Sequence, residues 1–138
     1  MNELLSAVGR GLGGILLLIP KCFYRALVVD EQRREGRRQV LRDIAAEMRI
    51  LVANSQFIGI GSGGEAKALH ETAAAAARLS ALGTEIEDPR LHELLKEFEH
   101  AARPFTDRRL PGDLDRPALR SARDKVADQL QELQAALR

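Results

Sequence analysis

Apolar and small residues in this chain recur at alternating steps of three and four, the spacing of one packed face of an α-helix. Between residues 41 and 58 the stripe has the spacing of a coiled-coil-like seam, and a second stripe follows near the C-terminus. The first contains Leu41, Ile44, Met48, Leu51, Ser55 and Ile58, and the second Leu119, Ala122, Val126, Leu130, Leu133 and Leu137. No segment alternates apolar and polar residues as a half-buried strand does, so the chain is predicted to be all-α.

Glycines, prolines and capping residues predict where these helices begin and end. A long helix is expected from Asp30 to Ile58, ended by the glycine-rich stretch 59–64. Ser62 and Glu65 have the spacing of a capping box for the next helix, the third when an N-terminal helix is counted. This helix is expected over about residues 64–82, with Gly83 as its stop.

The second half of the chain carries a further start signal and a proline-rich connection. Asp88 followed by Pro89 predicts the cap and first turn of a fourth helix. Its apolar positions are Leu91, Leu94, Leu95, Phe98, Ala102 and Phe105. Residues 104–117 contain three prolines and are predicted to be a loop, and the last helix is expected from about Arg116 to Leu137. Because the connections are short, we predict an antiparallel, up-down bundle of about four helices, with an additional N-terminal helix.

The first 29 residues differ from the rest, and we treat residues 1–29 and 30–138 as separate domains. The apolar run from Gly11 to Pro20 has ten residues, about half of what a membrane-spanning helix needs. On a helical wheel, large apolar residues share one face, and Leu17 is the exception on the polar side. This face contains Leu4, Leu5, Val8, Leu12, Ile15, Leu16, Ile19 and Phe23. The pattern predicts an amphipathic helix, kinked at Pro20. Two interpretations of its apolar face are nearly equal: it docks on the other helices and completes a soluble bundle, or it lies in a membrane interface or packs on a partner or a second subunit.

A basic stretch follows this segment directly. It consists of Arg33, Arg34, Arg37, Arg38 and Arg42, interleaved with Asp30, Glu31, Glu35 and Asp43. Three interpretations remain open: a solvated helix face with pairs at i,i+3 and i,i+4, a site for anionic lipid headgroups, or a site for nucleic-acid phosphates. The whole chain has a net charge of only +1, four Phe, one Tyr and no Trp, so nucleic acid is the least favoured partner.

The stretch from Gly59 to Gly64 satisfies the pattern G-x-G-x-x-G of dinucleotide-binding loops, with Glu85 further along. Such loops follow a strand within a βαβ unit, whereas the residues before Gly59 have helical periodicity. Glu65 stands where a phosphate-binding P-loop has its lysine. A flexible connection between helices is therefore favoured over an anion site.

Titratable residues suggest one further candidate site. Glu97 and His100 form the E-x-x-H half of a di-metal motif, with Glu93 one turn earlier. No second pair exists in the chain, and these residues lie away from the apolar stripe of their helix, so a solvated face is favoured. The single cysteine, Cys22, excludes an internal disulfide, and no Ser/His/Asp or Cys/His arrangement is present. We therefore predict no catalytic residues, no metal ligands and no cofactor.

Together these features favour a non-enzymatic helical adaptor or scaffold. Attachment is predicted through residues 1–29, to anionic lipid or to a partner protein, with Arg33, Arg34, Arg37 and Arg38 contributing electrostatically. The expected location is the cytoplasmic face of a membrane, with a soluble cytoplasmic protein, which could be a homo-oligomer, as the alternative. Two other functions remain open: a ligand- or metal-binding bundle, which would use residues 59–64 or the Glu93, Glu97 and His100 face, and a nucleic-acid-associated regulator.

Overall fold

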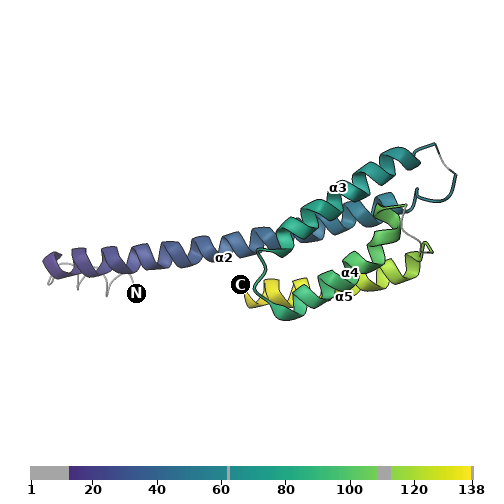
Figure 1. Cartoon of the computed structure of the whole chain (residues 1–138). Coiled ribbons are helices and arrows are strands. Elements are labelled where there is room, and N and C mark those ends of the chain that lie inside the picture. Colours follow the sequence, from purple (N-terminus) through teal and green to yellow (C-terminus); the bar gives the residue numbers. More distant parts are fainter. Residues whose placement is uncertain (1–12, 62, 109–112, 138) are drawn as a thin grey trace. The chain divides into compact units, whose positions relative to one another are not determined.

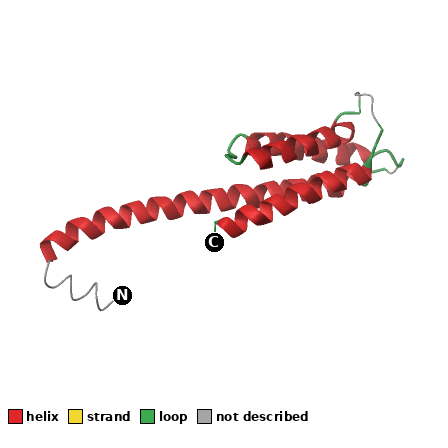
Figure 2. Ribbon diagram, turned by 90° about the horizontal axis from the view of Figure 1, so that it is seen from below, coloured by secondary structure: helices red, strands yellow, loops and turns green. Residues whose placement is uncertain are grey.

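The computed structural model describes residues 13–61, 63–108 and 113–137, and the side chains from residue 28 onward within these ranges. It divides into two units, Met1–Arg37 and Arg38–Arg138, which are described separately. Over the described ranges every regular element is a helix, which confirms the predicted all-α class (Figure 2).

The described helices are α2 (Gly13–Ser55), α3 (Glu65–Gly83), α4 (Pro89–Thr106) and α5 (Arg116–Ala136) (Figure 1). Helix α2 differs from expectation, because it runs without interruption through Pro20 and through the predicted boundary before Asp30. A proline within a helix removes only one backbone donor, and opposite charges at i,i+3 and i,i+4, such as Asp30 and Arg34, favour a continuous helix beyond it. The two segments that the sequence separated therefore belong to one helix.

The predicted stripes form the core of the unit Arg38–Arg138. All six seam positions between Leu41 and Ile58 are buried, as are all six apolar positions predicted for α4. On α5 the first four stripe residues are buried, while Leu133 and Leu137 are half-buried. Buried side chains from all four described helices join one cluster, so each helix of this unit contributes to a single core.

Helix α4 begins as predicted, with an aspartate cap followed by a proline in the first turn, and α5 begins in the same way at Asp115, a cap that the sequence analysis did not identify. The carboxylate of Asp88 accepts a hydrogen bond of 2.8 Å from Leu91 N, and that of Asp115 accepts one of 2.9 Å from Ala118 N. The end of α4 was predicted less well, because the helix continues past Pro104 to Thr106 instead of giving way to a loop there. The buried ring of Phe105 lies in this last turn, and its burial offsets the lost proline donor.

A few polar contacts join helices across the core. Thr72 on α3 is fully buried, and its Oγ1 lies 3.0 Å from Leu69 O and 3.2 Å from Phe105 O on α4, so one hydroxyl proton is shared between two carbonyls. Arg78 on α3 forms an ion pair of 2.8 Å with Glu47 on α2. Gln129 on α5 donates to the capping carboxylate of Asp88. These contacts fix which faces of the helices meet.

We expect Thr72→Val to destabilise the protein by about 1–2 kcal/mol, because Phe105 O loses a buried donor while the side-chain volume is kept. Thr106→Val is the matched control, since its hydroxyl makes a local bond to Arg103 O at an exposed site and its loss is expected to cost less than about 0.5 kcal/mol. Urea unfolding followed by far-UV circular dichroism measures both. Equal stabilities of the two variants would contradict a role for the bond between α3 and α4.

Candidate functional site

The predicted attachment face is only partly within the described residues. Leu4, Leu5, Val8 and Leu12 lie outside them. Helix α2 includes the other four, Ile15, Leu16, Ile19 and Phe23. Among the helices that the structure describes, none combines the length and the apolar character needed to cross a bilayer. From Gly13 onward, the backbone of the apolar run is helical.

The basic stretch lies on the same helix. Arg33, Arg34 and Arg37 are exposed, and every residue from Val29 to Arg37 is exposed. Arg38 differs, because it is half-buried and its guanidinium donates to the backbone carbonyl of Leu137 just beyond α5. A guanidinium at this position satisfies one of the carbonyls that a helix leaves without an intrahelical partner. One of the four predicted lipid-binding arginines therefore also has a structural role.

The glycine stretch connects α2 to α3 and follows a helix instead of a strand. Gly59 and Gly61 adopt positive φ angles of 79° and 73°, which favour glycine. The N-cap of α3 is Gly64, without a side-chain hydrogen bond, and Ser62, the predicted cap, lies outside the described residues. Glu65 Oε1 accepts a hydrogen bond of 3.1 Å from Gly59 N. The Glu65 carboxylate therefore already accepts the hydrogen bond of a loop N–H group that an anion site would need.

The other side of this loop is held by Arg116 from the first turn of α5. Its Nη2 donates to Ile58 O and lies 3.4 Å from Ser55 O. Its guanidinium carbon also lies 5.7 Å from the centre of the Phe105 ring, within the range of a cation–π interaction. The same arginine therefore joins the end of α2, the last turn of α4 and the start of α5.

The Glu93, Glu97 and His100 face is exposed, as the position of these residues off the apolar stripe predicted. Glu93 pairs with Arg90 at 3.4 Å, and Glu97 pairs with Lys125 at 3.7 Å. Within the part of the chain that is described, no three His, Cys, Asp or Glu side chains are placed to hold a metal ion. These carboxylates therefore form an ordinary solvated face in which charges of opposite sign meet.

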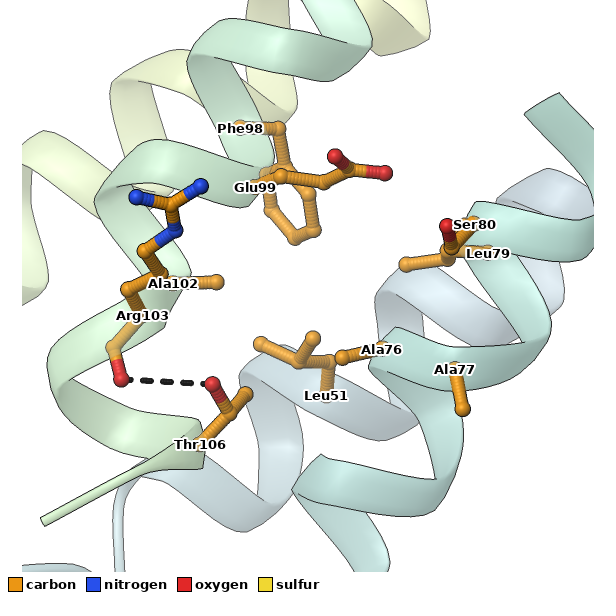
Figure 3. Close-up of a pocket in the computed structure, with 10 residues that line it drawn as sticks. All are labelled: Leu51, Ala76, Ala77, Leu79, Ser80, Phe98, Glu99, Ala102, Arg103 and Thr106. Atoms are coloured by element: carbon orange, nitrogen blue, oxygen red, sulfur yellow. Dashed lines mark hydrogen bonds between the residues drawn. The ribbon is translucent and has the colours of Figure 1, made fainter.

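Sequence reasoning missed a pocket of about 280 Å³ between α3 and α4, to which Leu51 of α2 also contributes (Figure 3). Small residues on α3 leave this space open, and the run from Ala73 to Ala77 is the signal that would have indicated it. Glu99 extends from α4 over the pocket towards α3, and Arg103 lies one turn further along (Figure 3). The pocket is lined by Leu51, Ala76, Ala77, Leu79, Ser80, Phe98, Glu99, Ala102, Arg103 and Thr106. It offers an apolar floor with one carboxylate and one guanidinium at its rim.

Comparison with protein-family models, curated proteins and solved structures gives no match to this chain. The function is therefore inferred from the chain's own residues. Three features stand out chemically: the apolar run with its arginines on α2, the uncharged loop from Phe57 to Gly61, and the pocket between α3 and α4.

The loop geometry predicts a graded response to alanine. Gly59→Ala is expected to cost about 2 kcal/mol or more, because its φ is positive and the new Cβ would meet Leu114 Cδ1. Gly61→Ala has the same backbone strain but open space, so about 1 kcal/mol is expected. Gly63→Ala, with neither constraint, is the control and is expected within about 0.5 kcal/mol of the parent. Urea unfolding gives the order, and equal costs at positions 59 and 63 would show that this turn is not required.

Proposed function

We propose that this protein is a non-enzymatic helical adaptor that attaches to an anionic membrane surface, at its cytoplasmic face, through residues 1–29. The observation that carries the proposal is the order of features along α2. An apolar run that is too short to span a bilayer is followed, on the same helix, by exposed arginines. This order matches an interfacial helix whose apolar face enters the lipid while nearby cations meet the headgroups.

The apolar face supports this attachment energetically. Burial of each of its eight large side chains, from Leu4 to Phe23, is worth on the order of 1.5–3 kcal/mol relative to water, so the face requires a cover. A membrane interface supplies such a cover without requiring a shaped pocket. A partner protein or a second copy of this chain is the competing cover, and the experiments below separate these cases.

The arginines supply the second contribution. Each basic residue near an anionic surface adds about 1 kcal/mol, and this term weakens with salt. The side chains of Arg33, Arg34 and Arg37 are exposed, so they lie at the surface of α2. A single weak membrane contact gives only marginal binding, whereas an apolar contact and an electrostatic contact together give stable attachment.

The unit Arg38–Arg138 would then serve as the adaptor, in the antiparallel, up-down arrangement that the sequence predicts. The exposed faces of α3 and α5 and the pocket between α3 and α4 are the surfaces that such an adaptor would present to other proteins.

Substitutions on opposite sides of the predicted wheel test the apolar contact. We expect Ile19→Gln, at the centre of the face, to weaken partition of the full chain into phosphatidylcholine–phosphatidylserine vesicles by about ten-fold or more. Leu17→Gln removes similar apolar surface from the polar side, and we expect it to change partition by less than about two-fold. Vesicle flotation measures both.

Two results would contradict the membrane proposal. One is a full chain that stays soluble and never floats, which would mean that protein covers the apolar face. The other is equal loss in the two variants, which would mean that the helix has no preferred lipid-facing side.

A charge-neutralising triple variant tests the arginines. We expect Arg33→Gln with Arg34→Gln and Arg37→Gln to lower affinity for the anionic vesicles by about 100-fold at low salt, and to leave binding to pure phosphatidylcholine unchanged. The control removes the same charge elsewhere, with Arg90→Gln, Arg108→Gln and Arg120→Gln, and should lose far less. If both triple variants lose the same amount, the effect is one of net charge, and the arginines of α2 do not form a surface contact.

A further inference from the structure

The loop between α2 and α3 exposes two large apolar side chains. Phe57 is 49% exposed and Ile60 is 58% exposed, whereas Ile58 between them is fully buried in the core. Over the described ranges, only Val29 joins these two as an exposed large hydrophobic residue. Ile58 therefore anchors the loop while its neighbours point outward, which places two apolar groups at one end of the unit Arg38–Arg138.

The surroundings of this pair carry no charge in the sequence. The nine residues from Gln56 to Gly64 contain no Asp, Glu, Lys or Arg, and four of them are glycines. Loops on protein surfaces ordinarily carry polar residues, because connecting segments face water. The side chains of this stretch can therefore enter a lipid interface without the cost of burying a charge of their own, while Glu65 and Arg116, which contact its base, pair with its backbone.

Between Phe57 and Gly59, three backbone N–H groups and one carbonyl have hydrogen-bond partners within the protein. Phe57 N donates to Asn54 O at 3.1 Å, and Ile58 N donates to Ser55 O at 3.2 Å. Gly59 N donates to Glu65 Oε1, and the carbonyl of Ile58 accepts from Arg116. Groups that are paired within the protein lose little when water is replaced by lipid, which offers no hydrogen bonds.

We propose that Phe57 and Ile60 form a second membrane contact, in which both side chains enter the interfacial region of a phospholipid bilayer. The insertion is shallow, because only the tip of the loop is apolar and an interfacial element enters about 5–10 Å. This inference rests on the proposed attachment of the chain to a membrane, and it adds a contact that residues 1–29 do not supply.

The experiment uses the absence of tryptophan from this chain, which makes any introduced Trp a single fluorescent reporter. Phe57→Trp and Ile60→Trp are made in the full chain, with Gln131→Trp at an exposed position of α5 as the control. Vesicles of phosphatidylcholine and phosphatidylserine are added, with and without brominated acyl chains. We expect the emission of both loop reporters to shift to shorter wavelength and to be quenched by the bromine, and the control to show neither effect.

A paired loss-of-function variant gives the contribution of the loop. Phe57→Ser with Ile60→Ser is expected to lower vesicle partition of the full chain by about ten-fold or more. Because both side chains are already exposed, the variant should keep the unfolding midpoint of the parent, which circular dichroism checks.

The outcomes separate this inference from the proposed function. If the chain floats with vesicles but the loop reporters neither shift nor quench, the loop contact is wrong and attachment through residues 1–29 stands. If the chain does not float and the reporters do not respond, both are wrong. A shift that appears without lipid as protein concentration rises would show that a second copy covers the loop, and this result also overturns the inference.

Discussion

The guanidinium of Arg116 joins the end of α2 to α4 and α5, beside the backbone bonds that Phe57 N and Ile58 N make to the last turn. A helix that ends within a protein leaves backbone carbonyls without intrahelical partners, and these groups need donors. Arg116 supplies donors to the carbonyls of Ile58 and Ser55, and it reaches them from the first turn of α5 while lying over the Phe105 ring. Because a planar guanidinium offers several donors in a fixed geometry, one residue joins three helices where lysine could not.

The conformation of the following loop rests on this junction. With Ile58 held in the core and its carbonyl paired, the chain turns through Gly59 at positive φ, and Leu114 packs where a side chain at position 59 would be. Glu65 closes the turn from the other side by accepting from Gly59 N. Local backbone geometry, side-chain packing and hydrogen bonding therefore agree on one loop shape, and that shape leaves Phe57 and Ile60 outside.

Sequence reasoning predicted those parts of the fold that depend on periodicity and local caps. The seam from Leu41 to Ile58 and the cap at Asp88 follow from short-range patterns, and the structure contains both. The equivalent cap at Asp115 was overlooked, although it has the same aspartate and first-turn proline. Contacts between residues far apart in the sequence were not predictable. Arg38 was assigned to lipid binding, but it also donates to Leu137, ninety-nine residues away. The pocket between α3 and α4 was missed for the same reason, because it forms only where two helices meet.

The chain thus handles its apolar residues in two different ways. In the unit Arg38–Arg138 the stripes are covered by one another, and long-range contacts of Arg38, Arg78 and Arg116 join the helices that carry them. Residues 1–29 have an equally wide apolar face in their sequence, but they are followed by arginines instead of by a matching stripe. No stripe of apolar residues directly follows this face to cover it, so we expect another surface to cover it. The adjacent positive charges favour an anionic surface. The difference in charge, more than the difference in hydrophobicity, separates the part that folds on itself from the part that we expect to bind a surface.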